Sequence, residues 1–394
     1  MRAAALALIC AVLGAAAALG LGRAFGLVGG STTTETVVVR AAAPAHDAPA
    51  VVRSVAPSTA SPTAFPAARV FARRSPGVVT VFSYFGGVAA QGSGFVVSSS
   101  GTILTNAHVI TNAGETTGTV RAASSVYVEF PDHDRIPARV VGWDVFDDVG
   151  VLRIASSAHA LVALPLGRSA PVVVGEPVAA IGSPLGNADS LAVGVVSAVG
   201  RSIAALTAPH FQLIDAIQTD APIAHGSSGG PLLDAAGRVI GINAQIRSDQ
   251  GNGSGIGFAV PAGAARRSLH ELLTKGRVTY AYAGLQTEDL TPALAHHLGL
   301  PVGYGALIDS VTAGGPAARA GLRGGSREEQ FQGEAVLVGG DVVVAVAGRT
   351  VRSADDLVRI VTNTLQPGRM AVFRVVRAGS RRAITVRLAA RVSR

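Results

Sequence analysis

The stretch QTDAPIAHGSSGGPLL, residues 218–233, decides how this sequence is interpreted. It places two adjacent serines, Ser227 and Ser228, after Gly226 and before two further glycines. A flexible linker has no chemical need for this order. A nucleophilic serine has one, because a glycine two residues earlier lets both N–H groups point toward a developing oxyanion. Taken alone, the stretch is also compatible with a simple loop, so the partners of a reactive serine must be sought elsewhere in the chain.

Two other segments contain suitable partners. GTILTNAHVIT, residues 101–111, places His108 in a short polar turn after an apolar strand. DVFDDVGVLRI, residues 144–154, places Asp147 and Asp148 directly before a strongly β-prone run. Each segment alone has an ordinary structural explanation. Together, a hydroxyl, an imidazole and a carboxylate are the groups that nucleophilic acyl transfer requires.

The rest of the chain predicts a mostly β protein. From about residue 70, short β-prone runs such as GVVTVFSY, SVYVEF and GIGFAVP recur between glycine-bearing turns, which indicates an antiparallel barrel or sandwich. A helix is expected over 261–276, ending at Gly276. A second unit begins near Tyr280 and combines strands with a helix that Ser353 can cap.

The N-terminal part reads differently. Residues 3–22 are apolar and uncharged, long enough to cross a hydrocarbon core of about 30 Å, so residues 1–30 are predicted to be a signal anchor that spans the membrane. A cleaved signal peptide and secretion are the alternative. Residues 31–69 are rich in Pro, Ala, Ser and Thr, which predicts a disordered linker. The catalytic part is therefore expected outside the cytoplasm.

Composition argues against several other functions. The net charge is +8, but the arginines are scattered and no basic run alternates with aromatic residues, so nucleic-acid binding is not expected. The single cysteine, Cys10, excludes an intramolecular disulfide. His296 and His297 lack the spacing of a metal site, and no metal or other cofactor is expected.

Three ordered blocks, GSGFVVSSSGTILTNAHVI (92–110), DVFDDVGVLRI and QTDAPIAHGSSGGPLL, closely resemble those of the HtrA (DegP-like) serine proteases. The resemblance covers about residues 70–392. It implies a trypsin-like double β-barrel protease domain over 70–276. On YAGL, GGPAARAGLRGG and GGDVVVAVAGRTV, it also implies a smaller α+β PDZ domain over 280–392.

The resemblance also implies the roles of individual residues. His108 corresponds to the general base, Asp148 to the residue that orients it, and Ser228 to the nucleophile, while the N–H groups of Gly226 and Ser228 correspond to the oxyanion hole. Asp148 is chosen over its neighbour because it directly precedes the VGVL strand, and Ser228 because it precedes Gly-Gly-Pro. Two departures stand out: Ser227 replaces the usual Asn, which could change loop rigidity, and Gly150 replaces the usual Ala, which could loosen its strand.

Substrate preference follows from the same resemblance. Pro222 lies six residues before the nucleophile, at the bottom of the primary specificity pocket, where no acid is present to bind Arg or Lys. Cleavage after small or medium aliphatic residues is therefore expected. The predicted pocket residues are Pro222, Ile223, Gly257 and Phe258.

In the second unit, the resemblance implies that Tyr282, Ala283, Gly284 and Leu285 form a carboxylate-binding loop, which receives peptide C-termini. Residues 326–338 are an insertion, either a surface hairpin or a regulatory contact. Homotrimers are expected, with Phe65 and Phe71 as candidate contacts.

The sequence thus predicts an ATP-independent, extracytoplasmic serine endopeptidase. It would degrade or process misfolded envelope proteins by a Ser-His-Asp acyl-enzyme mechanism, and its PDZ domain would capture the C-termini of unfolded polypeptides. The alternatives are a non-catalytic chaperone or peptide-sensing scaffold, and a regulated protease that cuts one signalling protein.

Overall fold

The computed structural model describes residues 65–393, apart from 114–118, 168–171, 184–189, 206, 208–211, 225 and 247–255. The predicted transmembrane segment and most of the predicted linker lie outside these residues. In the part of the chain that is described, no helix is long and apolar enough to cross a membrane.

Helix α2 (Ala67–Arg74) is the first described element, and the sequence did not predict it. It begins at Ala67, inside the segment that was expected to be linker. One side of this short helix buries Val70, and this burial stabilises it. Phe65 and Phe71 are half-buried against the core of this same chain. A short 3-10 turn, η1 (Ser75–Gly77), leads into the first strand.

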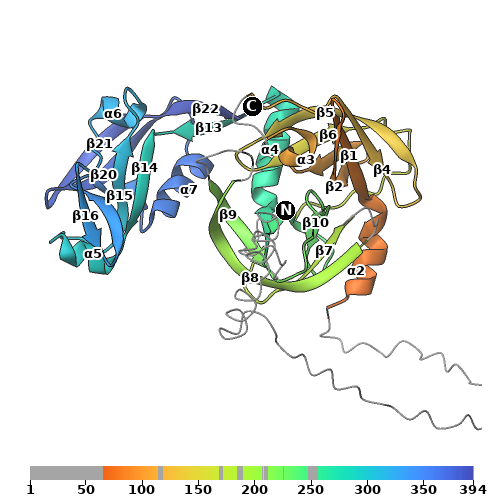
Figure 1. The fold of residues 1–394 in the computed structure, drawn as a ribbon, viewed down its shortest axis with the longest axis horizontal. Helices are drawn as coiled ribbons and strands as arrows, with labels where there is room; N and C mark the ends of the chain where they lie inside the picture. The colour runs from red at the N-terminus through yellow and green to blue at the C-terminus, as the bar shows by residue number, and fades with distance from the viewer. Residues whose placement is uncertain are drawn as a thin grey trace, which may run out of the picture. The chain divides into compact units, whose positions relative to one another are not determined.

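Six strands close into a first barrel in the order β1-β2-β3-β6-β5-β4 (Figure 1). Apolar side chains from these strands fill its interior, where Val81, Phe95 and Leu104 are fully buried. The strands are β1 (Val78–Phe85), β2 (Val88–Ser98), β3 (Thr102–Thr105), β4 (Ser125–Glu129), β5 (Arg135–Asp144) and β6 (Val149–Arg153). Between β3 and β4, the expected polar turn is instead a short helix, α3 (Ala107–Ile110).

A second closed barrel has the order β10-β11-β12-β9-β8-β7. Its strands are β7 (Pro177–Gly182), β8 (Ser190–Ala204), β9 (Gln212–Thr219), β10 (Pro231–Leu233), β11 (Val239–Ile246) and β12 (Gly257–Pro261). Helix α4 (Ala262–Lys275) follows and ends at Gly276, as predicted, and the φ of 68° at this glycine makes it a left-handed cap. Leu272 of α4 packs against Gly142 of β5, so this helix also covers the first barrel (Figure 1).

Most of the chain after α4 forms one β-sheet with short helices packed against it. Its order is β14-β15-β18-β20-β21, with β19 added to β18, and β14 lies at one edge. Ser353 caps α7 by accepting the Asp356 N–H at 3.0 Å, as predicted. The elements are β14 (Leu285–Leu290), α5 (Pro292–His297), β15 (Gly305–Val311), α6 (Pro316–Ala320), β18 (Val342–Val346), β19 (Arg349–Thr350), α7 (Ala354–Thr364), β20 (Met370–Arg377) and β21 (Ser380–Arg387).

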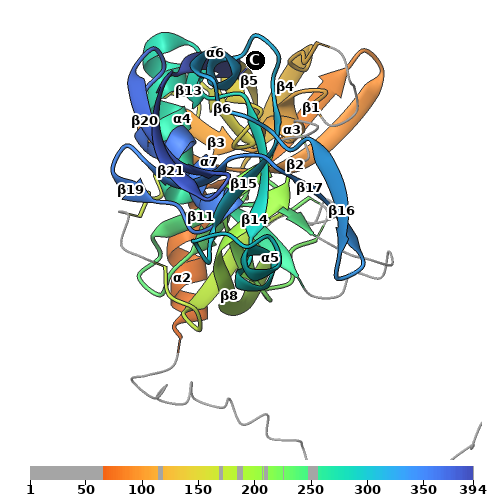
Figure 2. The same ribbon diagram turned by 90° about the vertical axis from the view of Figure 1, so that its left-hand side faces the viewer.

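Two strand pairs complete the described chain. β13 (Val278–Tyr282) pairs with β22 (Ala389–Ser393), which joins the start and the end of the second unit. The insertion folds as a hairpin of β16 (Arg327–Phe331) and β17 (Glu334–Val338), which stands beside β14 and α5 (Figure 2). Both barrels and this sheet belong to one compact unit, residues 62–394.

Candidate active site

The first pair of the predicted triad is formed in the structure. His108 lies on α3, directly after β3, and its Nδ1 is 2.7 Å from Oδ2 of Asp148. The other carboxylate oxygen of Asp148 accepts the backbone N–H of His108 at 3.0 Å. A carboxylate at Nδ1 fixes that nitrogen as the donor, which leaves Nε2 as an acceptor for a hydroxyl proton.

Asp148 sits on a constrained turn between β5 and β6. Its φ is +51°, in the left-handed region that non-glycine residues seldom adopt. Its carbonyl accepts the side-chain amide of Asn106 at 2.8 Å, and the residue is 4% exposed. Backbone strain held by surrounding bonds is a recurrent feature of functional sites.

Ser228 belongs to the second barrel and is brought to the first by backbone bonding. Its carbonyl accepts the N–H of Ser93, on β2, at 2.7 Å. The Ser93 hydroxyl donates to the Gly226 carbonyl at 2.6 Å and accepts the Ser183 N–H at 2.9 Å. The serine turn is therefore attached to the barrel that carries His108 and Asp148.

The turn also leaves two donors available. Gly226 has a φ of +94°, a conformation that favours glycine. Among the described residues, neither the Gly226 N–H nor the Ser228 N–H donates to any acceptor. Two unengaged N–H groups beside a serine are what stabilisation of an oxyanion needs.

The hydroxyl of Ser228 points elsewhere in this structure. It donates to the carbonyl of Ala244 at 3.0 Å, and no hydrogen bond joins it to His108. Catalytic bonds are often absent before substrate binds, and a serine side chain changes direction by rotating about one bond. In this structure the Ser228 hydroxyl would have to rotate away from the Ala244 carbonyl to meet the imidazole of His108.

The Asp148 carboxylate also sets the protonation of His108. Burial lowers the pKa of the imidazole, but the charge of Asp148 and its hydrogen bond together outweigh burial. The pKa of His108 therefore lies above its ordinary value. This base is neutral, and able to accept a proton, only above that raised pKa.

A buried carboxylate that the sequence reasoning missed holds the turn before Asp148. Asp144 is fully buried and accepts the hydroxyls of Ser268 at 2.7 Å and Tyr280 at 2.5 Å. The Val145 N–H, next in the turn, donates to the Ser393 hydroxyl at 2.7 Å. Asp144 is the first residue of the DxxxD block, four residues before Asp148. This additional aspartate was the sequence signal that could have identified it.

Asp147, the neighbour of the predicted orienting residue Asp148, has a different set of contacts. Its Oδ2 is 2.5 Å from the guanidinium of Arg267 on α4. It is thus engaged with a cation, while its neighbour Asp148 faces the imidazole.

The residues predicted for the specificity pocket do not share one environment. Pro222 is exposed, whereas Ile223 is buried. A Cβ added to Gly257 would lie 2.6 Å from Cδ1 of Ile223, so these two residues are in contact. Phe258 is 5% exposed and belongs to the main hydrophobic core. Among the described residues, no group of three or more potential ligands could hold a metal ion.

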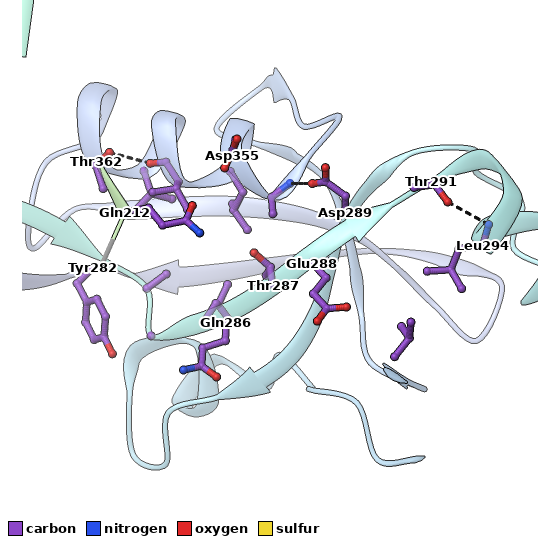
Figure 3. A pocket seen from close by; sticks show the side chains of 18 of the residues that line it. Gln212, Tyr282, Gln286, Thr287, Glu288, Asp289, Thr291, Leu294, Asp355 and Thr362 are labelled. Carbon is purple, nitrogen blue, oxygen red and sulfur yellow. Dashed lines mark hydrogen bonds between the residues drawn. The ribbon is translucent and has the colours of Figure 1, made fainter. Parts of the chain in front are cut away.

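The predicted carboxylate loop opens onto a groove of about 780 Å³ (Figure 3). Gly284 has a φ of +79°, and its carbonyl and that of Ala283 accept the N–H groups of Thr312 and Ala317. Within the described chain, the N–H groups of Ala283 and Gly284 have no acceptor. The edge strand β14 and helix α7 form the long walls of this groove.

Comparisons with known proteins agree with this architecture. Residues 92–242 match the family described as trypsin-like peptidase domain, and residues 281–388 match the PDZ domain family. The solved structure of the HtrA-type protease AlgW with a tripeptide is 32% identical and has a TM-score of 0.67. The match covers 82% of this chain and 97% of that one. The chain belongs to the HtrA-type protease family.

Other HtrA-type relatives are longer than the matched region. A probable periplasmic serine endoprotease, DegP-like, of Brucella suis is 36% identical over 301 residues, which is 76% of this chain and 53% of that protein. The equivalent protein of Chlamydia trachomatis is 37% identical over 291 residues, 74% of this chain and 52% of that protein. The chain thus spans about half the length of the curated relatives it matches.

Proposed function

We propose that this HtrA-type protein is a serine endopeptidase that acts on unfolded or misfolded polypeptides by an acyl-enzyme mechanism. The observation that carries the proposal is the bond between His108 Nδ1 and Asp148, with the Ser228 turn attached to the same barrel through Ser93. Domain limits of 70–276 and 280–392 are proposed for the protease and PDZ parts, with α2 added to the former.

In the proposed reaction, the Ser228 hydroxyl leaves the Ala244 carbonyl and attacks the scissile carbonyl carbon, while His108 Nε2 takes its proton. The carbonyl oxygen becomes an oxyanion, which the N–H groups of Gly226 and Ser228 stabilise. The C–N bond then breaks, His108 gives its proton to the leaving amine, and an ester remains on Ser228. A water molecule, deprotonated by His108, attacks the carbonyl carbon of this ester. The C–O bond to Ser228 then breaks, His108 returns the proton to the Ser228 oxygen, and the carboxylic acid product leaves.

The proposed specificity is for small or medium aliphatic residues on the acyl side of the cut. Pro222 and Ile223 bring no negative charge to the position that would have to bind Arg or Lys. A library of fluorogenic peptides checks this, since preferred cleavage after Arg would overturn it.

The proposed second activity is capture of peptide C-termini by the loop Tyr282–Leu285. The open groove and the unengaged N–H groups of Ala283 and Gly284 support it. Solved HtrA-type neighbours that carry a tripeptide or a decapeptide lend further support.

The proposed location is extracytoplasmic, supported by curated relatives named as periplasmic. A membrane anchor within residues 1–30 remains part of the proposal, with cleavage as the alternative, and N-terminal sequencing of the mature protein distinguishes them. A homotrimer is also proposed, which light scattering after size exclusion tests directly.

The decisive experiment compares casein degradation by the wild type, Ser228→Ala and Ser227→Ala. Ser228→Ala should lose activity by a factor on the order of 10⁴ or more, and it should no longer react with a fluorophosphonate. Ser227→Ala is the matched control, since it changes the adjacent serine, and it should keep both properties. Equal turnover by the wild type and Ser228→Ala would overturn the proposed function.

A further inference from the structure

The groove beside β14 has two ends of different chemistry. At the loop end, the described lining has no acidic residue and combines apolar side chains, such as Leu285 of β14 and Val361 of α7, with the uncharged Gln212, Tyr282 and Thr362 (Figure 3). At the far end, it is lined by four acidic residues from three elements: Glu288 and Asp289 of β14, Glu334 of β17 and Asp355 of α7. Among the described lining residues, the one Lys or Arg is Arg391, which lies near Tyr282 at the loop end.

The insertion builds part of the far end. Phe331, Glu334 and Val336 of the β16–β17 hairpin line the groove opposite α7. The ring of Phe331 packs against His297 of α5, with centroids 5.2 Å apart. The hairpin therefore contributes one wall of the groove at this end, with one aromatic ring and one carboxylate.

Neighbouring cations do not neutralise this end. Arg327 and His297 both pair with Glu329, outside the groove. No ion pair within the described chain involves Glu288 or Glu334. Asp289 accepts the Ala354 N–H at 2.7 Å (Figure 3), a bond that leaves its negative charge in place.

One further acid, Asp309, is affected by the charge at this end, and Asp355, one of the four, has a cation on its own helix. Burial and the nearby charge of Glu288 raise the pKa of Asp309, on the neighbouring strand β15, to about 6. Asp355 lies in the first turn of α7, and Arg359 of the same helix partly offsets its charge.

The direction of a bound peptide follows from the loop. A C-terminal carboxylate held by the N–H groups of Ala283 and Gly284 places the last residue beside Leu285, at the start of β14. The peptide then runs antiparallel to β14, and its fourth to sixth residues from the end lie beside Glu288, Asp289 and the hairpin, at about 3.4 Å per residue. Figure 3 shows Asp289 turned toward the start of α7 and Glu288 on the other side of the strand.

We propose that the acidic far end of this groove selects polypeptide C-termini that carry Lys or Arg at the fourth to sixth positions before an apolar terminal residue. The long apolar stem of Lys or Arg can lie against Phe331 and Val336 while its charged head meets Glu288 or Glu334. This inference rests on the proposed capture of peptide C-termini and specifies which ends are preferred.

The test uses the full chain with Ser228→Ala, so that peptides are bound without being cut. Three fluorescent decapeptides share one apolar C-terminal triplet and differ only at positions four to six from the end, which are all Lys, all Gln or all Glu. In fluorescence anisotropy, the Lys peptide should bind roughly tenfold more tightly than the Gln peptide, and the Glu peptide more weakly than both. The preference should shrink at 0.5 M NaCl, because salt screens partly exposed charges.

The variant Glu288→Gln/Glu334→Gln should bind the Gln peptide as before and lose most of the preference for Lys. Glu328→Gln is the matched control, because this residue lies on the same hairpin but does not line the groove, and it should keep the preference. Equal binding of the three peptides by the unsubstituted groove would overturn the charge inference alone. If none of the three peptides binds, the proposed capture of C-termini in the groove is overturned. Casein degradation by the wild type would still support the proposed protease activity in that case.

Discussion

At the scale of single residues, Asp148 combines three contacts in one turn. Its two carboxylate oxygens meet the backbone and the ring of His108, and its carbonyl holds Asn106. The imidazole is thereby fixed at two points, which determines both its orientation and the nitrogen that carries the proton. Replacement of this carboxylate should therefore alter the pH dependence as well as the rate.

Asp148→Asn should lower kcat by about 10⁴-fold, because an amide no longer holds the required tautomer. It should also move the acid limb of kcat/KM to lower pH. The reason is that Asp148 raises the pKa of His108 and the reaction needs neutral imidazole. Rates on a chromogenic peptide between pH 5 and pH 9 measure both effects. Asp147→Asn, which affects the contact with Arg267 instead, should leave the limb in place, and an unchanged limb in Asp148→Asn would contradict the assignment.

Asp144 should make stability depend on pH. Burial, and then the charge of Asp147, raise its pKa from 3.8 to about 6, against the hydrogen bonds from Tyr280, Ser268 and Ser393 that lower it. The folded state therefore holds a proton on Asp144 that the unfolded state has released. The protonated carboxyl group therefore adds to the free energy of unfolding by up to about 3 kcal/mol. This stabilisation is complete below about pH 4 and is lost as the pH rises through about 6.

The measurement is urea unfolding at pH 5 and pH 8, followed by the fluorescence of Trp143, the single tryptophan. From pH 5 to pH 8, the wild type should lose stability relative to Asp144→Asn, which cannot ionise at this position. A constant difference between the two proteins would show that Asp144 does not titrate in this range.

At the scale of elements, the serine turn depends on glycines for a reason that sequence reasoning only partly gave. In the structure, a Cβ on Gly229 would lie 2.1 Å from the Ser93 carbonyl oxygen, and one on Gly230 would lie 2.2 Å from that of Ile181. The glycines are needed because the turn packs directly on two strands.

Gly229→Ala should destabilise the protein by at least about 2 kcal/mol, because it combines this overlap with a φ of +88°. Gly263→Ala is a useful contrast, since no atom lies within 4 Å of the added Cβ and the residue is in α4. It should stabilise the protein by up to about 1 kcal/mol. Thermal unfolding of the two variants checks the difference in sign, and similar melting temperatures would argue against tight packing of the turn.

Elements with a clear local pattern were predictable, and others were not. Most barrel strands, α4 with Gly276 and α7 with Ser353 follow from periodicity and capping. Helix α2 did not, because its short apolar face has meaning only against a core formed by distant strands. Gly150 was expected to loosen its strand, but a Cβ there would lie 2.7 Å from Ile110 and 2.8 Å from the Asn106 carbonyl oxygen, so this core has little room for Ala.

The candidate site was predictable to a similar extent. Three local blocks indicated His108, Asp148 and Ser228, because each block has a distinct composition. The bonds that hold them were not predictable, since Ser93 and Ser393 carry no local signal and act only across folded elements. Asp144 had a signal in the DxxxD block, but its partners on α4, β13 and β22 become visible only in the folded chain. The direction of the Ser228 hydroxyl, toward Ala244, is likewise a property of the folded turn.

At the scale of the whole molecule, a charged contact joins α7 to the second barrel. Arg359 Nε lies 2.5 Å from Asp215 Oδ1, and each side chain is 32% exposed. Asn363 of the same helix also donates to Asp215, at 3.3 Å. Because water reaches both charges, the contact is expected to contribute modestly to stability.

A double-mutant cycle of Asp215→Ala and Arg359→Ala should give a coupling of about 0.5–1 kcal/mol in the free energy of unfolding. The coupling should fall toward zero in 0.5 M NaCl, as expected for exposed charges. The pair Glu129 and Arg135, within the first barrel, is the control for salt effects that do not involve α7. Additive single changes at low salt would show that the contact does not couple the two elements.

The position of β14 has one more consequence, for solubility. An unpaired strand at the rim of a sheet ordinarily invites other chains to add on indefinitely, which leads to fibrils. Here α7 runs along the far side of the groove, so an incoming tail would meet β14 on one flank and a helix on the other. The groove thus leaves room for one added strand, and α7 closes this edge of the sheet to further strand addition.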